Sequence, residues 1–142
     1  MESVETQSDR LSAVPNECLC NSRLPFFECC GPSLSMNLPA ATCLQLMRSR
    51  FSAFRQRNSR YLLRTWHKST RPPVGELESH WNQWVSLRID DTTKGRVNDS
   101  HGTVSFTAFY LDGEYLRSFA EVSRFVKVDG QWFYVDGVVN VD

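Results

Sequence analysis

Four cysteines near the N-terminus constrain this chain more than any other feature of its sequence. Cys18 and Cys20 are separated by one residue, and the adjacent pair Cys29 and Cys30 follows after eight more. A segment this short buries too little apolar surface to fold by itself, so a crosslink or a metal ion has to order it. Zinc binds four thiolates tetrahedrally at about 2.3 Å. The sequence therefore predicts a closed, structural zinc site at Cys18, Cys20, Cys29 and Cys30.

Two alternatives to metal remain open for these cysteines, namely two disulfides or four free thiols. Cys29 and Cys30 are poor disulfide partners for each other, because the usual Cα separation in a disulfide exceeds that of neighbouring residues. The sequence has no basic segment followed by an apolar run at its start, and no apolar run of the roughly 18–20 residues that span a bilayer. We therefore expect a cytoplasmic protein without membrane contacts, in which closely spaced cysteines bind metal more often than they pair.

Composition and pattern divide the 142 residues into four segments. Residues 1–16 are polar and aperiodic, which predicts a disordered tail. Residues 17–32 contain the cysteine cluster, and the Ser, Asn and Pro residues of 33–39 are typical of a linker. Residues 40–142 carry most of the aromatic side chains and are long enough for one domain with its own core. We therefore expect the cysteine segment to be an attachment that the larger domain does not need.

Three helices are predicted at the start of the larger domain. Thr42 and Gln45 form a capping box for the first, and apolar residues recur behind it at helical steps. Asn58 or Ser59 caps a second helix that ends near Trp66, ahead of two prolines. A short third helix is indicated by apolar steps at Leu77, Trp81 and Trp84. Cys43, in the first turn of the first helix, is interpreted as a buried structural thiol.

Alternating apolar residues then predict four strands. The first contains Val85, Leu87 and Ile89, and three more follow from residue 102, joined by tight turns at residues 112–113 and 129–130. Three helices followed by such a meander predict an α+β domain, in which the helices pack on one face of a curved, mainly antiparallel sheet.

If both turns are two-residue loops, one face of the sheet is aromatic. The predicted cross-strand pairs are Tyr110 with Tyr115, Phe106 with Phe119, Phe125 with Tyr134, and Ser123 with Asp136. A β-bulge in either hairpin would reverse the orientation of the residues beyond it. The candidate pocket residues on this face are Phe106, Tyr110, Phe119, Ser123, Phe125, Trp132 and Tyr134.

Three side chains are candidates for acid–base catalysis. Glu121 and Asp136 are predicted to lie beside Ser123 on the aromatic face, where burial raises a carboxyl pKa. His67 follows the second helix. Each has a structural alternative: Glu121 pairs with an arginine of the helical layer, Asp136 caps a turn, and His67 packs or caps. Arg124 is predicted on the opposite face, reaching a carboxylate or a chain end.

Several blocks of the sequence resemble a known family. The cysteine pattern, ending in Cys29-Cys30-Gly31-Pro32, resembles the SEC-C zinc-binding motif. The blocks that follow resemble the bacterial YchJ-like family in order and spacing. They are residues 46–54 (LMRSRFSAF), 61–67 (YLLRTWH), 70–72 (TRP), 121–125 (EVSRF) and 129–137 (DGQWFYVDG).

The resemblance implies a SEC-C zinc site followed by a nuclear transport factor 2-like fold, a cystatin-like cone with a cavity, in a largely uncharacterised family. The chain departs from the motif where Gly-Ser-Gly usually follows the second cysteine, since it has Asn21-Ser22-Arg23 instead. The positive φ that glycine adopts easily therefore falls to Asn21 and Arg23. All four thiols remain, so we expect altered geometry and not loss of metal.

The sequence leaves three functions open. The resemblance favours a binding or adaptor module, whose zinc knuckle contacts a protein partner. A small-molecule carrier or enzyme would use the aromatic cone. The interval between Glu28 and Glu76 contains eight basic residues and no acidic one, and nucleic-acid binding would use these positive charges. Such charges usually form a solvated helix face. A homodimer through the sheet is a further alternative. The sequence does not name a substrate or a reaction.

Overall fold

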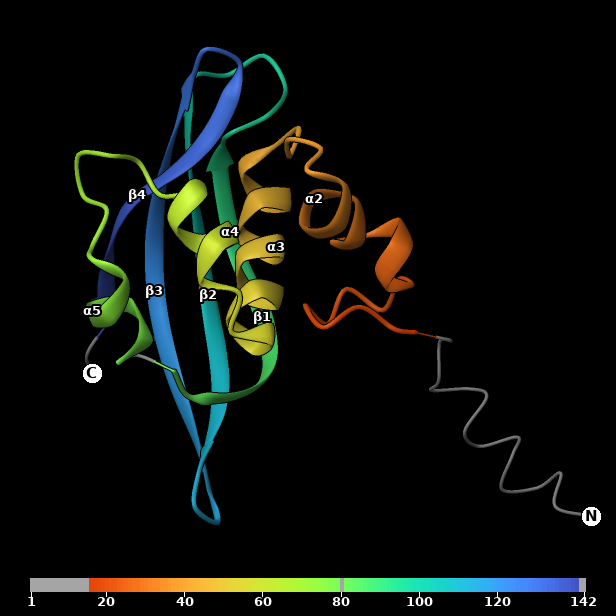
Figure 1. The fold of residues 1–142 in the computed structure, drawn as a ribbon, viewed down its shortest axis with the longest axis vertical. Helices are drawn as coiled ribbons and strands as arrows, with labels where there is room; N and C mark the ends of the chain where they lie inside the picture. Colours follow the sequence, from red (N-terminus) through yellow and green to blue (C-terminus); the bar gives the residue numbers. More distant parts are fainter. Residues whose placement is uncertain (1–15, 80, 141–142) are drawn as a thin grey trace, which may run out of the picture.

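The structure is a computed structural model that describes residues 16–79 and 81–140 (Figure 1). The tail predicted at residues 1–16 lies outside this range except for its last residue. The elements, in order, are η1 (Phe26–Glu28), α2 (Gly31–Met36), α3 (Cys43–Gln56), α4 (Ser59–Arg64), α5 (Val74–Glu78), β1 (Gln83–Lys94), β2 (His101–Asp112), β3 (Tyr115–Val128) and β4 (Gln131–Asn140). None of the helices in the described part has the length and apolar character needed to cross a membrane.

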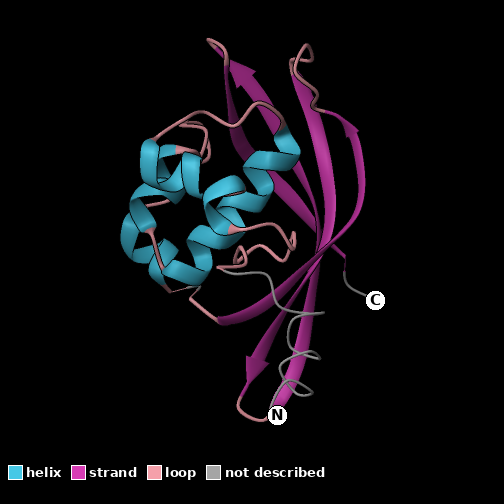
Figure 2. Ribbon diagram, turned by 90° about the vertical axis from the view of Figure 1, so that its right-hand side faces the viewer, coloured by secondary structure: helices cyan, strands magenta, loops and turns pink. Residues whose placement is uncertain are grey.

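The four strands form one antiparallel sheet in the order β1-β2-β3-β4. Figure 2 shows the helices gathered on one side of this curved and twisted sheet, as the sequence predicted for an α+β domain. The core lies between α3 and the covered face, where Leu46, Phe51, Phe106 and Phe125 are buried. No helix of residues 16–79 or 81–140 lies against the other face of the sheet.

The helix boundaries follow the capping signals of the sequence. The Thr42 side chain accepts a hydrogen bond from the Gln45 amide at 3.1 Å and starts α3, and the Asn58 side chain does the same for the Tyr61 amide at the start of α4. The third helix is shorter than predicted. It ends at Glu78, and Trp84 belongs to β1, because the apolar steps there continue from a helix into a strand.

Cys43 is buried in the first turn of α3, as predicted, and its environment explains why. The Sγ atom packs on Gly95, where a Cβ would overlap it, and Gly95 also has a φ of +76°. Burial raises the pKa of the Cys43 thiol to about 11, so the thiol stays protonated. Cys43 is therefore a structural side chain that packs the start of α3 against the end of β1.

The first hairpin turn lies one residue later than predicted, which shifts the pairing of its two strands by two residues. Asp112 pairs with Tyr115, so the loop is Gly113-Glu114, with Gly113 at a φ of +64° in its first position as a type II′ turn requires. Phe106 consequently lies opposite Glu121 and not Phe119. A shift of two residues leaves every side chain on its predicted face.

The second hairpin has the predicted turn but also a bulge. Phe125 pairs with Tyr134 as predicted, whereas Arg124 pairs with Asp136, so Val135 is an extra residue in β4. The residues of β4 beyond this bulge are reversed in orientation. The predicted pair of Ser123 with Asp136 is therefore wrong, since Ser123 lies opposite Gly137.

Candidate metal centre and ligand cavity

The four cysteines of the N-terminal segment converge on one point. Their sulfur atoms all lie within 4.8 Å of one another, with Cys20 Sγ 3.6 Å from Cys29 Sγ and Cys29 Sγ 4.0 Å from Cys30 Sγ. A tetrahedral ion with metal–sulfur bonds of about 2.3 Å requires sulfur–sulfur distances of about 3.8 Å. The donor set and its spacing therefore fit a four-thiolate metal site.

Hydrogen bonds and burial shift the thiol pKa values of the cluster in opposite directions. Hydrogen bonds from Cys20 and then Cys30 lower the pKa of Cys18, whereas the hydrogen bond with Cys18 raises the pKa of Cys30. Burial raises the pKa of Cys29 to about 11. Several adjacent thiolates need a cation among them, because like charges at this distance repel strongly in a poorly solvated site.

The cysteine segment adopts the backbone that the departure from the SEC-C pattern predicted. Asn21 has a φ of +67° and Arg23 a φ of +74°, the left-handed conformation that glycine adopts most easily. The intervening Ser22 hydroxyl donates to Cys29 Sγ at 3.1 Å. Non-glycine residues are thus accommodated at both positions, and the serine between them donates a hydrogen bond to one sulfur of the cluster.

The cysteine segment is docked on the larger domain and is not a separate attachment. Cys18, Cys20 and Cys30 are buried in one cluster with the core. Arg48 of α3 donates to the carbonyl of Cys20 at 3.2 Å, and the Asn21 side chain accepts from the amide of Leu87 in β1 at 3.0 Å.

Helix α2 also replaces the first part of the predicted linker at residues 33–39, and packs beside α3 (Figure 1). Pro32 lies in the first turn of this helix, where its fixed φ suits the helical backbone, and Asn37 ends the helix in a left-handed conformation. The sequence signals of a loop were in fact those of the two ends of a short helix.

A cavity of about 250 Å³ lies between the helices and the covered face of the sheet. Its walls come from α3, the segments around α4 and α5, and all four strands, and they are mainly apolar and aromatic. Trp84 sits at one end in edge-to-face contact with Tyr110, Phe119 and Phe51, with ring centroids 5.1–6.2 Å apart. Such rings form a rigid apolar wall around the cavity.

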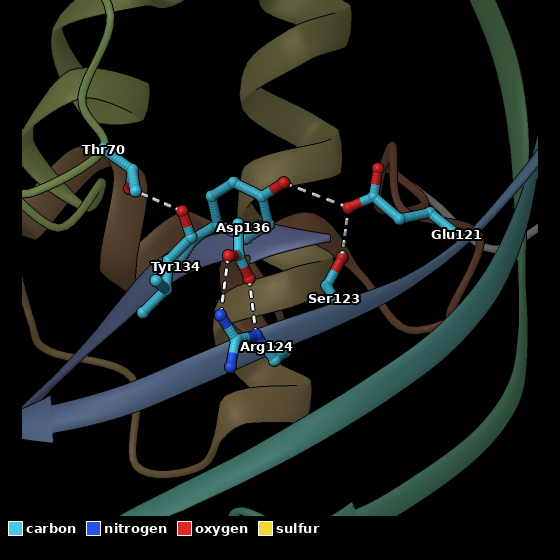
Figure 3. A network of polar contacts seen from close by, with 7 residues as sticks. Thr70, Glu121, Ser123, Arg124, Tyr134 and Asp136 are labelled. Atoms are coloured by element: carbon cyan, nitrogen blue, oxygen red, sulfur yellow. Dashed lines mark hydrogen bonds and ion pairs between the residues drawn. The ribbon is translucent and has the colours of Figure 1, made fainter. Parts of the chain in front are cut away.

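The opposite end of the cavity is polar. One carboxylate oxygen of Glu121, Oε2, accepts hydrogen bonds from the Ser123 hydroxyl at 2.7 Å and from the Tyr134 hydroxyl at 3.0 Å (Figure 3). Burial, and then the nearby Glu121 carboxylate, raise the pKa of Tyr134, so this hydroxyl stays protonated as a donor. The network orients Glu121 toward the cavity.

Arg50 adds a buried positive charge at this end. Only 3% of its surface is exposed, and one of its guanidinium nitrogens, Nη1, donates to the Leu62 carbonyl at 2.8 Å and the Thr65 hydroxyl at 2.7 Å. The guanidinium carbon lies 4.9 Å from the ring centroid of Trp66 and 4.6 Å from that of Tyr134. These cation–π contacts stabilise the charge in place of a carboxylate partner.

Two indole N–H groups of the cavity wall have no hydrogen-bond partner in the described chain, although the nitrogen atoms are buried. They belong to Trp66, beside Arg50, and to Trp84, at the aromatic end. Buried donors are nearly always satisfied in folded proteins, so each unpaired donor in a cavity requires an explanation. Because both nitrogen atoms are shielded from the open space of the cavity, an acceptor there would reach them only after the indole rings or their neighbours move.

The structure brings five of the seven candidate pocket residues to the cavity, namely Phe106, Tyr110, Phe119, Ser123 and Tyr134. The other two do not line it. Phe125 is buried in the core, and Trp132 packs below the start of α3, where its indole donates to the Ala41 carbonyl at 3.1 Å.

The three catalytic candidates separate. Glu121 lines the cavity, but Asp136 lies on the outer face, where both of its oxygens accept from Arg124 at 2.6 and 2.7 Å (Figure 3). The ion-pair partner expected for Arg124 is therefore Asp136. His67 lies outside the cavity, with Nδ1 2.7 Å from the Ser69 hydroxyl. Of the three, only Glu121 is placed to contact a molecule in the cavity.

Sequence reasoning missed three polar groups of the cavity, namely the side chains of Arg50, Trp66 and Trp84. Arg50 carried a signal, because it lies three residues after Met47 and four before Phe54 and thus shares their helix face. Trp66 and Trp84 lie at the ends of elements, where helical or strand periodicity no longer indicates which way a side chain points.

The sequence of residues 42–137 matches the family model of the YchJ middle, nuclear transport factor 2-like domain. The chain belongs to the YchJ family. A UPF0225 protein from Streptomyces avermitilis is 42% identical over 123 residues, covering 87% of this chain and 84% of that protein. A UPF0225 protein from Polaromonas naphthalenivorans is 44% identical over 115 residues, covering 80% and 82%.

Two solved structures resemble this YchJ-family fold. A SEC-C motif containing protein from Rhodopseudomonas palustris superposes with a TM-score of 0.78 at 30% identity, covering 89% of this chain and 99% of that one. A second, from Psychrobacter arcticus, has a TM-score of 0.70 at 24% identity, covering 89% and 82%, and supports the fold alone. The predicted family and fold class are confirmed. The family's relatives are uncharacterised, so function has to be argued from this chain's own residues.

Proposed function

We propose that this chain is a zinc-stabilised protein that binds a small molecule in the cone cavity. The observation that supports it is the combination of a mainly aromatic cavity with convergent polar groups at one end, from Glu121 and Arg50. Binding sites for small molecules are typically apolar cavities with a few placed polar groups. At about 250 Å³ the cavity is slightly smaller than the roughly 300–1,000 Å³ typical of such sites.

Zinc is the metal proposed for the four-cysteine site. Thiolates are soft ligands that select zinc over magnesium or calcium, and four protein ligands leave the ion no open position for a substrate. The role proposed for the ion is therefore structural, while the cavity, formed by other residues, provides the binding site.

A cavity-filling substitution tests the proposal. Ala108 is buried on the cavity wall, and Ala108→Leu adds volume where a ligand would lie. Ala120→Leu on the adjacent strand is the matched control, because Ala120 pairs with Thr107 and points to the other face. A ligand at about 100 times its dissociation constant raises stability by about 2.7 kcal/mol. A metabolite screen by thermal unfolding should find compounds that stabilise the wild type and Ala120→Leu but not Ala108→Leu. Equal stabilisation of all three would contradict the proposal.

A second candidate function, an adaptor role for the zinc knuckle, is favoured by exposed apolar side chains within it. Leu24 and Phe27, both in the cysteine segment itself, are 49% and 63% exposed. Exposed apolar groups that gather in one region are typical of protein contact surfaces.

Phe27→Ser should reduce recovery of a specific partner in pull-down experiments, with metal content unchanged. Val97→Ser, at an equally exposed site on the β1–β2 loop, is the control. The same recovery with both variants would count against this role.

The arginines of the helical layer do not favour a nucleic-acid site. Arg48 and Arg55 donate to carbonyls of the cysteine segment, Arg50 is buried beside the cavity, and Arg64 donates to the Asn37 side chain. These charges pack the layers of this protein together. They do not form an unpaired basic stripe of the kind that binds phosphates.

A further inference from the structure

The polar end of the cavity has unused donors on one side and an unused acceptor on the other. Both hydrogen bonds of the Arg50 guanidinium use one nitrogen, Nη1, and the other two nitrogens have no hydrogen-bond partner among the described residues. Glu121 Oε2 is satisfied twice, but Oε1 has no partner in the described chain (Figure 3). A molecule at this end has to offer both an acceptor and a donor.

The charges at this end already balance. Burial lowers the pKa of Arg50 to about 10, which leaves the guanidinium charged at neutral pH, and Glu121 lies near enough to contribute to that pKa. An anionic group placed here would be repelled by Glu121, and a cationic group by Arg50. Because neither charge is screened by bulk water in a cavity, a neutral polar group is favoured over either.

The geometry points to a small neutral aromatic amide or lactam as the ligand class, an inference that rests on the proposed function. Its carbonyl accepts from the Arg50 guanidinium, and its N–H donates to Glu121 Oε1. The ring lies toward Phe51, Trp84 and Phe119, whose faces and edges line the apolar end. The cavity volume of about 250 Å³ limits the ligand to one or two rings.

Four probes that share one ring test this class. Benzamide is neutral with a carbonyl and an N–H, benzoate is its anionic counterpart, benzylamine is the cationic one at pH 7, and N,N-dimethylbenzamide lacks the N–H. Each is titrated into the full-length, zinc-loaded chain, labelled so that the indole N–H signals of Trp66 and Trp84 are read by NMR. Benzamide should shift both signals and bind at least about tenfold more tightly than the other three. Equal or tighter binding of benzoate, benzylamine or N,N-dimethylbenzamide would overturn the inference.

The variant Glu121→Gln tests the charge argument separately. It removes the negative charge at nearly constant shape, so Arg50 becomes unbalanced and the ratio of benzoate to benzamide affinity should rise about tenfold. Tyr110→Phe, at the aromatic end, should leave that ratio unchanged. An unchanged ratio in Glu121→Gln would overturn the inference. If this variant does not fold, the ranking of the four probes on the wild type decides alone.

Binding without a preference for benzamide rejects the ligand class only. Absence of any shift with all four probes at millimolar concentration rejects the binding cavity itself.

Discussion

Different interactions stabilise the cysteine knuckle (residues 16–30) and the cone, which consists of the sheet and the helices that cover it. Residues 16–30 contain only one short 3₁₀ helix, and their order depends on converging sulfurs and on two left-handed non-glycine residues. The cone has four strands of 10–14 residues around an aromatic core. Helix α3 serves both, with Arg48 and Ser52 toward the knuckle and Arg50 and Phe51 toward the cavity. One helix can therefore join a segment with little regular structure to a domain with a large buried core.

Loss of the metal should have the largest effect on stability, and it should affect the knuckle and the cone differently. Cys29→Ser with Cys30→Ser removes two ligands, so bound zinc should fall from one per chain to none, and stability should fall by more than about 5 kcal/mol. Elemental analysis and denaturant unfolding measure both. Hydrogen exchange should show loss of protection in the knuckle and retention in the sheet. Cys43→Ala, at the buried thiol outside the cluster, should keep its zinc. Full zinc in the double variant would refute the assigned ligands.

Truncation of a core side chain of the cone should have the second-largest effect on stability and should leave the bound metal in place. Phe125 is 1% exposed and among the largest fully buried side chains. Phe125→Ala should lower stability by about 3–5 kcal/mol, because it removes transfer free energy and leaves a cavity. Denaturant unfolding measures the loss, and metal analysis should still find one zinc per chain. A large loss of zinc from the folded variant would show that the two regions are not separable.

The hydrogen bond between the two regions should contribute less. Asn21 accepts from the Leu87 amide across the junction and also has a φ of +67°. Asn21→Ala loses the hydrogen bond and strains the backbone, and should cost about 1–2 kcal/mol. Asn21→Gly loses only the hydrogen bond and should cost less. Both variants should show faster exchange of the Leu87 amide. Equal stability of all three proteins would show that this contact does not join the knuckle to the cone.

The smallest effect is expected at the surface of the cone, from the Arg124–Asp136 pair. The hydrogen bond from Arg124 holds the pKa of Asp136 below its usual value, so the pair stabilises the fold above the unfolded pKa of about 3.9 and ceases to do so as pH falls through the lower, folded value. Both side chains are exposed, so the contribution is small. Melting temperatures of the wild type and Asp136→Asn should differ slightly at pH 7 and converge by about pH 2. A difference that grows in acid would contradict the assigned pairing.

Much of the fold followed from local patterns, and part of the cavity did as well. Thr42 and Asn58 cap the helices that their positions predicted, and Phe106, Tyr110 and Phe119 reach the cavity because a two-residue shift in a hairpin preserves the face. The missed features depend on pairing between segments. The bulge at Val135 turned Asp136 away from the cavity, and nothing in the spacing of β4 alone indicated it.

The sequence by itself determined that Cys18, Cys20, Cys29 and Cys30 form one cluster, that Asn21 and Arg23 are left-handed, where the second turn lies, and the fold class. These depend on the chemistry of neighbouring residues and on their periodicity along the chain. Only the tertiary structure decided that Arg50 is buried without a carboxylate partner, that Glu121 meets Tyr134 and not Asp136, and that the knuckle packs on α3. Such contacts join residues far apart in the sequence, and their partners are chosen by the packing of whole elements.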